Sequence, residues 1–406
     1  MYGKRSLGLS ILLLFVLGCS LFSPPPMDPA PITPIPNIMP EAIAEENTDN
    51  TPLVLNTHLP NGVVTEQNGL ITVFDSDGYT ILQTRPPNIN ASNIHIASSL
   101  SAESTSLPLF YYSFEQNYSI FFYNAGQVAT LRSVPFFAGL IGAEGYPFIA
   151  YTTAEFADDA LISDLYVGTP DSLPTAASLL NDVDPKGWAL SALYIDVIDG
   201  KVEGIWYAKQ PWGIGGDIVF QPRRTLSYLE LSTGTAYQYL GAEANPSALS
   251  ADREWVAYTN DTSVEAGGGA MSARNLESGE YISFPLLQVI DQRGAGNASF
   301  SPSNQYLAWM EASGSQMGET PNFHTVVRVG NLNGNVIAEF ADTAFLTTSG
   351  LSTIQRVEPV GWFDDNTLVV MARGEHWDEA MLIAIDIPSQ SMRLLARGVF
   401  VGFTYP

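Results

Sequence analysis

The chain has 406 residues, and 42 acidic residues against 17 basic ones give it a formal net charge of −25 at pH 7. A surface this acidic repels nucleic-acid phosphates and anionic lipid headgroups, which excludes nucleic acid as a partner. Cations and basic protein surfaces remain as electrostatic partners, and a general adaptation to the habitat explains the acidity at least as well.

The N-terminus predicts a secretory signal. Lys4 and Arg5 precede an apolar run over residues 7–17, which is too short to cross a hydrocarbon core about 30 Å thick. Residues 16–19 then read Val-Leu-Gly-Cys and resemble the lipobox of bacterial lipoproteins. The resemblance implies a signal peptide over residues 1–18.

Cys19 is the residue that this resemblance marks for lipidation. It is the single cysteine of the chain, so an internal disulfide cannot form. We expect export and anchoring at the cell membrane or outer membrane, facing outside the cytoplasm, with the lipid as the only membrane contact. An ordinary signal peptide with a chance cysteine is the alternative.

A proline-rich stretch follows, with eight prolines in the eighteen residues 23–40. Proline at this density favours an extended polyproline conformation and prevents a packed core. Residues 41–51 are polar and acidic, with little to bury. We therefore predict that residues 19–51 form a stalk that begins with the lipidated Cys19, and that the folded domain spans residues 52–406.

The domain itself has the pattern of strands. Short segments rich in β-branched and aromatic residues alternate with turns of Gly, Asn, Asp, Ser and Pro, and no helical stripe exceeds two turns. This pattern predicts an all-β fold. The segments include residues 70–74, 109–113, 119–123, 148–152, 204–208, 326–330 and 381–385.

Three stretches repeat one pattern. Residues 248–259, 299–310 and 360–371 each run from an apolar residue through a polar turn into an alternating strand. A unit that recurs about every 40 to 60 residues cannot bury its apolar face alone, which indicates a single β-propeller of four-stranded blades. We predict seven blades, with six or eight left open. The predicted blades begin near Asn61, Asn93, Gly145, Gly187, Asn245, Ala295 and Arg356.

The two ends of the domain are predicted to meet. Residues 62–84 hold only three strands, and residues 398–404 form a further strand that belongs to no other blade. Pairing of this C-terminal strand with the first blade would close the ring and remove its free edges.

The repeats also resemble a known family. Residues 301–308 read Ser-Pro-Ser-Asn-Gln-Tyr-Leu-Ala and resemble the Ser-Pro-Asp-Gly-Lys-x-Leu-Ala core of TolB-type, WD-repeat-like propeller repeats. Residues 249–257 are a variant that lacks the proline and the glycine. The resemblance covers about three of the seven units, and it implies a fold without implying any catalytic or binding residue.

Catalytic signatures are absent from the sequence. It contains no Gly-x-Ser-x-Gly, Ser-x-x-Lys or His-Glu-x-x-His motif, so we predict no catalytic residue, metal site or cofactor. The four histidines are widely scattered.

Residues 75–78 read Asp-Ser-Asp-Gly and are similar to the start of a calcium loop, but the rest of that loop is missing and a hairpin turn is favoured. Residues 181–187 are interpreted as a connector between two blades.

The most unusual segment spans residues 208–224 and has three glycines in four positions. Its aromatic, acidic and basic side chains suit a carbohydrate or an anionic ligand, and the alternative is a long loop packed against the ring. Two further insertions, residues 265–269 and 374–379, occupy the same position in their blades and would share one rim with it. The predicted ligand-binding residues of this rim are Trp212, Asp217, Arg223, Arg224, His376 and Trp377.

Two functions follow from these observations. The first is a lipid-anchored extracytoplasmic propeller that binds a protein, peptide or glycan, or serves as a scaffold, on the cell envelope. The second is a carbohydrate-active enzyme that uses carboxylates in the propeller channel. The absence of catalytic motifs favours the first.

Overall fold

The computed structural model describes residues 59–87, 94–96, 105–114, 118–134, 138–157, 159–212, 220, 224–242, 244–259, 269–288, 293–314, 323–376 and 378–405. The predicted signal peptide, Cys19 and the stalk lie outside these residues, as do Asp217, Arg223 and Trp377.

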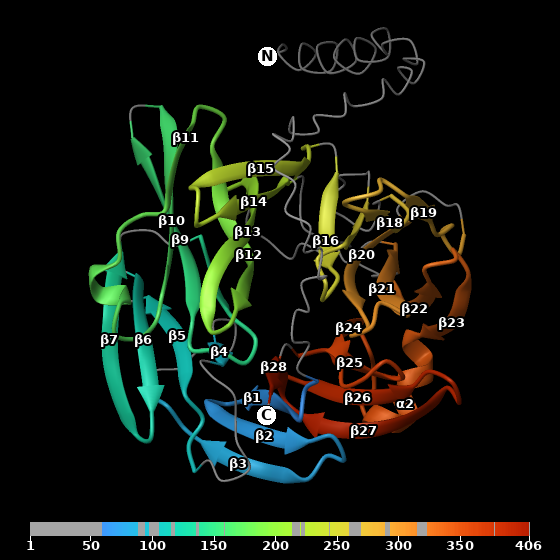
Figure 1. Cartoon of the computed structure of the whole chain (residues 1–406). Coiled ribbons are helices and arrows are strands. Elements are labelled where there is room, and N and C mark those ends of the chain that lie inside the picture. The colour runs from blue at the N-terminus through green and yellow to red at the C-terminus, as the bar shows by residue number, and fades with distance from the viewer. Residues whose placement is uncertain are drawn as a thin grey trace, which may run out of the picture. The chain divides into compact units, whose positions relative to one another are not determined.

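The described strands form seven four-stranded antiparallel sheets, which are the blades of a β-propeller (Figure 1). The prediction of an all-β, seven-bladed propeller is confirmed. Blade 1 contains β1 (Gly62–Gln67), β2 (Leu70–Asp75), β3 (Thr80–Thr84) and β28 (Val399–Thr404). Blade 2 contains β4 (Ile94–Ile96), β5 (Leu109–Phe114), β6 (Tyr118–Asn124) and β7 (Gln127–Val134). Blade 3 contains β8 (Gly139–Gly142), β9 (Ile149–Ala157), β10 (Ala160–Gly168) and β11 (Leu180–Asp184).

The other four blades follow the same plan. Blade 4 contains β12 (Trp188–Ile198), β13 (Lys201–Pro211), β14 (Leu226–Glu230) and β15 (Thr235–Leu240). Blade 5 contains β16 (Asn245–Leu249), β17 (Trp255–Thr259), β18 (Ser272–Asn275) and β19 (Tyr281–Ser283). Blade 6 contains β20 (Arg293–Phe300), β21 (Tyr306–Ser313), β22 (His324–Asn331) and β23 (Val336–Ala341). Blade 7 contains β24 (Arg356–Trp362), β25 (Thr367–Arg373), β26 (Ala380–Asp386) and β27 (Ser391–Arg397). Short helical turns are η2 (Leu173–Thr175), η3 (Asp342–Phe345) and α2 (Leu346–Ser349).

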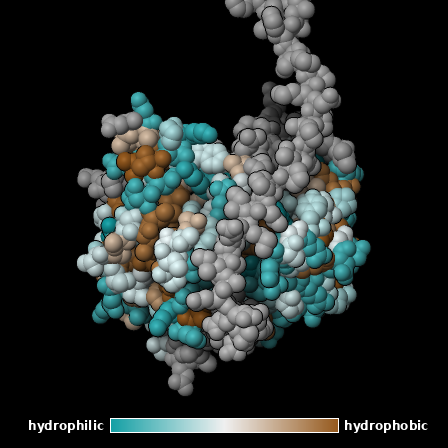
Figure 2. All heavy atoms as spheres, turned by 45° about the horizontal axis from the view of Figure 1, so that its top comes forward, coloured by the Kyte–Doolittle hydropathy of each residue, from teal (hydrophilic) through white to brown (hydrophobic). Residues whose placement is uncertain are grey.

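The hydrophobic core lies between the blades. An apolar cluster fills each junction of two neighbouring blades, such as the one in which Val327 of blade 6 packs with Val370 of blade 7. Each blade therefore needs a neighbour on both sides, as expected for a repeat that cannot bury its own faces. In Figure 2 hydrophilic residues cover most of the visible face, and apolar residues form separate groups between them.

The C-terminal strand closes the ring as predicted. β28 pairs antiparallel with β1, and Phe403 lies opposite Val63 in this register. Phe403 also packs at the junction of blades 1 and 7, where its ring lies against Gly361. A Cβ atom at position 361 would stand 2.3 Å from a ring carbon of Phe403, so glycine is required there.

The repeated turns join the first and second strands of blades 5 and 6. The Oγ atoms of Ser250 and Ser301 accept the backbone N–H groups of Trp255, at 2.8 Å, and Tyr306, at 3.0 Å. These bonds hold both turns in the same shape. They also explain why serine opens each copy of the motif.

Two boundary predictions are wrong. Blade 3 begins at β8 and not at Gly145, because the positive φ of Gly145, +73°, belongs to the turn between β8 and β9 within that blade. Residues 181–184 are part of β11, so only residues 185–187 of the predicted connector join blades 3 and 4. An outer strand faces solvent on much of its surface, so it tolerates the polar residues that resemble a loop.

Candidate functional site

Two adjoining cavities open at the end of the ring where the first strand of each blade turns into the second. Their volumes are about 280 Å³ and 260 Å³. They share five lining residues, which come from blades 1, 3, 4 and 5: Glu144, Tyr194, Ala251, Arg253 and Tyr405. We call this region the channel mouth.

Arg253 is the central side chain of the channel mouth. It occupies the repeat position at which the TolB-type core has glycine, and its φ of +63° is left-handed. An arginine held there costs about 1–2 kcal/mol in backbone strain. Strain of this kind is concentrated at functional positions, so Arg253 marks the channel mouth as a candidate site.

The Arg253 guanidinium is fixed by several contacts. Nε donates to Asp196 Oδ1 at 2.8 Å, Nη1 donates to the Ser250 carbonyl at 2.9 Å, and the group lies 4.9 Å from the centre of the Tyr194 ring. Burial alone would lower the pKa of Arg253, but the charge and hydrogen bond of Asp196 outweigh it and raise that pKa. Arg253 is therefore a permanent, oriented cation.

Two carboxylates accompany this cation. Asp196 Oδ2 accepts the indole N–H of Trp206 at 2.7 Å, so both oxygens of Asp196 are engaged. Glu144 bonds to the Tyr405 hydroxyl, and burial together with this carboxylate raises the pKa of Tyr405 well above its usual range. Tyr405 thus remains a neutral donor at any physiological pH.

His95 of β4 lines the second cavity. Burial lowers its pKa to about 4, so the imidazole is neutral and can both donate and accept a hydrogen bond. The channel mouth therefore combines one cation, two anions and neutral hydrogen-bonding groups.

Replacing His95 with glutamine is expected to reduce the loss of stability on acidification. Below pH 6.5 the unfolded histidine takes up a proton, whereas the folded one does so only near pH 4. The wild type should lose up to about 3 kcal/mol across this window from this group, and H95Q should not. Urea unfolding at pH 7 and pH 4 measures the difference, with the exposed His376→Gln as control. An equal pH dependence in H95Q and the wild type would contradict the assignment.

Three of the six residues predicted to form a ligand-binding rim, Trp212, Arg224 and His376, lie in the described part of the chain. Trp212 packs at the junction of blades 3 and 4, with its ring centre 5.4 Å from that of Phe156. Arg224 lies at the junction of blades 4 and 5, where its Nε donates to the Pro246 carbonyl of blade 5 at 2.8 Å. Burial lowers the pKa of Arg224 to about 10. His376 is exposed in the turn between β25 and β26.

The insertions follow the second strands of blades 4, 5 and 7 and precede the third, at residues 212–225, 260–271 and 374–379, and the strand ends that flank them lie at one end of the ring. This end is opposite the channel mouth, because a second strand starts at one end of the ring and finishes at the other. The sequence analysis did not find Glu144, Asp196 or Tyr405. The one sequence feature that could have indicated the channel mouth is Arg253, which stands where the repeat usually has glycine.

Within the described residues, no group of three or more His, Cys, Asp or Glu side chains is placed to hold a metal ion. The Asp75 carboxylate accepts the backbone N–H groups of Asp77, at 3.0 Å, and Tyr79, at 2.8 Å, in the hairpin turn between β2 and β3. The hairpin interpretation of residues 75–78 is thus confirmed.

No helix within the described residues is long and apolar enough to span a membrane.

Comparisons with known proteins support the fold. No protein-family model matches the chain, and no curated protein matches it. Among solved structures, a prolyl endopeptidase matches with a TM-score of 0.51 at 8% identity, over 84% of this chain and 50% of that one. The chain thus spans about half the length of that enzyme.

Two further structures are similar over most of both chains. TolB from Acinetobacter baumannii gives a TM-score of 0.40 at 11% identity, over 84% of this chain and 80% of that one. An oligogalacturonate lyase from Vibrio parahaemolyticus gives 0.47 at 12% identity, over 83% and 86%. TolB proteins are thus among its structural neighbours, and likeness at such low identity concerns the fold alone.

Proposed function

We propose that this protein is a lipid-anchored, extracytoplasmic binding protein of the cell envelope. The signal-like N-terminus, Cys19 and the proline-rich residues 23–40 support export, a lipid anchor and a spacer. Retention of the wild type in the membrane fraction and its loss in Cys19→Ser would support the anchor, and equal fractionation of the two would contradict it.

The channel mouth is the proposed binding site, and its ligand is a peptide segment of a partner protein. The first cavity has apolar walls that include Pro302, Trp362 and Phe403. Glu144 and Arg253 add one charge of each sign to the same walls. A peptide has apolar side chains together with polar backbone groups and charged ends, so it matches this mixture.

The observation that carries this proposal is the strained Arg253, which bridges the two cavities with its guanidinium fixed. Peptides selected from a random library on the full-length protein should bind R253Q and E144Q at least tenfold more weakly, since each variant removes one fixed charge. Arg397→Gln, on the exposed outer strand of blade 7, should bind them as the wild type does. Unchanged binding to R253Q and E144Q would overturn the proposal.

A carbohydrate-active enzyme is the second candidate. Glu144 and Asp196 line the same cavity beside Arg253, which supplies the channel carboxylates that this function needs. The engagement of both Asp196 oxygens favours the binding function, because that group is committed to its partners. Release of sugar from envelope glycans by the wild type, and not by Glu144→Gln, would identify the enzyme instead.

A further inference from the structure

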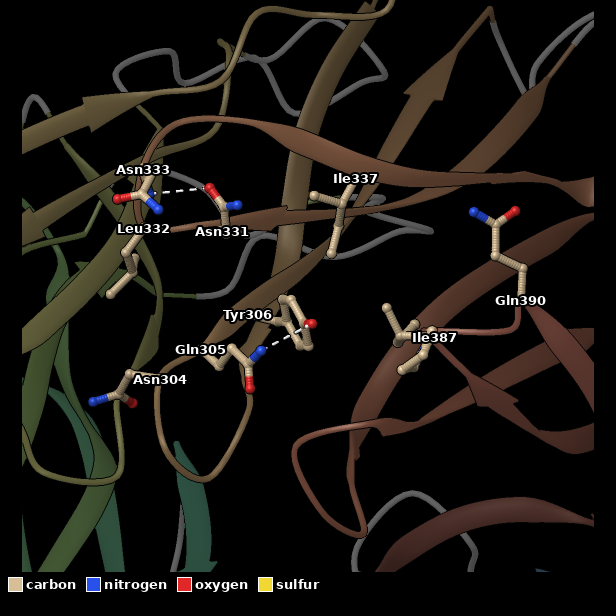
Figure 3. Close-up of a pocket in the computed structure, with 10 residues that line it drawn as sticks. Asn304, Gln305, Tyr306, Asn331, Leu332, Asn333, Ile337, Ile387 and Gln390 are labelled. Atoms are coloured by element: carbon tan, nitrogen blue, oxygen red, sulfur yellow. Dashed lines mark hydrogen bonds between the residues drawn. The ribbon is translucent and has the colours of Figure 1, made fainter.

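A second hollow lies between blades 6 and 7, on the same end of the ring as the channel mouth. It has a volume of about 610 Å³. Turns of both blades line it, and Figure 3 shows Tyr306 between the asparagines of blade 6 and Gln390 of blade 7. We call it the amide groove, because five of its ten lining residues are amides: Asn304, Asn331, Asn333, Gln305 and Gln390.

None of the ten lining residues is charged, although the chain carries 42 acidic residues. Each amide offers two donors and an acceptor, which matches the mixed donor and acceptor character of a hydroxyl group. A purely apolar ligand would leave those amide atoms that have no partner within the protein unsatisfied, at a cost of about 1–3 kcal/mol for each one buried. The lining thus selects an uncharged ligand that is rich in hydroxyl groups.

The amides are held in place before any ligand arrives. Asn331 Oδ1 accepts the backbone N–H groups of Asn333, at 3.0 Å, and Asn335, at 3.2 Å. Asn304 has a φ of +60° and occupies, in the repeat of blade 6, the position that Arg253 occupies in blade 5, where the TolB-type core has glycine. Its amide nitrogen donates to Asp252. A preorganised groove loses less conformational entropy on binding.

Tyr306 adds an aromatic surface of fixed orientation. Its ring stacks on Trp362, with centres 6.1 Å apart and planes 20° from parallel, and its hydroxyl accepts from Gln305 Nε2 at 3.0 Å. Ile337 and Ile387 add apolar side chains to the same lining. Sugar rings have an apolar C–H face and a polar rim, so an aromatic ring surrounded by amides fits them.

We propose that the amide groove binds a neutral glycan. The residues differ from those of the channel mouth, and the ligand differs in chemistry. A glycan in the amide groove would give the protein a second point of attachment, independent of any peptide in the channel mouth.

The test is a titration of the full chain with neutral oligosaccharides: β-1,4-linked glucose, mannose and xylose hexamers and a β-1,3-linked glucose hexamer. At least one should bind, and an oligouronide of the same length should bind at least tenfold more weakly. Asn304→Gly and Gln390→Gly each remove an amide, on opposite sides of the groove, while keeping a residue suited to the positive φ of both positions; each should weaken binding about tenfold. Tyr79→Ala, 73% exposed on blade 1, is the control and should bind normally.

The outcomes separate the two sites. Arg253→Gln should leave glycan binding unchanged, even if it abolishes peptide binding at the channel mouth. The glycan proposal is overturned if no neutral hexamer binds, if N304G and Q390G bind as the wild type does, or if a neutral peptide competes better than any hexamer.

Discussion

Replacing Glu311 with glutamine is expected to lower the free energy of unfolding by about 3–5 kcal/mol. Glu311 is 1% exposed in blade 6, where it accepts from Arg293 Nε at 3.0 Å, from Arg328 and from the backbone N–H of Leu287 at 3.0 Å. Loss of its charge leaves Arg293 buried without its carboxylate and weakens the pairing of Arg328. Urea unfolding of the purified protein measures the change.

Glu339→Gln is the matched control, because it removes a carboxylate from the same network. Glu339 pairs with Arg328 at 2.7 Å, but its side chain is 39% exposed. Water can compensate for the lost charge, so the cost should stay below about 1 kcal/mol. Equal losses in E311Q and E339Q would show that burial does not set the strength of this network.

The sequence predicts the architecture well because the relevant signals are local and repeated. The serine that opens each turn in blades 5 and 6 is visible in the chain, as is the alternating strand that follows it. The orphan strand at residues 398–404 is also visible. Its pairing partner follows from the need to remove free edges.

The channel mouth could not be predicted in this way. Glu144, Asp196, Arg253 and Tyr405 come from four blades, and each stands alone in an ordinary turn or strand. Closure of the ring brings these residues together, so their spacing along the chain does not indicate that they form one site. The insertion at residues 208–224 has an unusual composition, whereas the residues of the channel mouth lie in short turns and strands of ordinary composition.

The amide groove and the channel mouth each contain a residue that replaces the glycine of the repeat. Arg253 and Asn304 replace glycine at equivalent positions of two repeats, and each lines a different hollow. A repeat that departs from glycine at a position of positive φ must tolerate strain, although asparagine tolerates it better than arginine. Departures from the consensus at such positions therefore direct attention to sites that the fold alone does not reveal.

Deleting residues 399–406 is expected to abolish the cooperative unfolding of the domain. The deletion removes β28, leaves β1 with an unpaired edge facing the channel and opens the junction of blades 1 and 7, where Phe403 packs against Gly361. Blades 1 and 7 would then each expose an apolar face. Urea unfolding followed by circular dichroism should show a broad transition of reduced slope, and the truncated chain should aggregate.

A circular permutant separates the loss of the strand from the change of the chain end. Residues 398–406 are moved in front of Pro60, so that β28 and β1 become an ordinary antiparallel hairpin; Thr404 already lies opposite Gly62. This permutant keeps every contact of β28 and should regain the sharp transition of the wild type, because ring closure needs the strand and not its place in the chain. If the truncated chain unfolded with the midpoint and slope of the wild type, β28 would add nothing to closure, and the geometry of the channel mouth would lose its support.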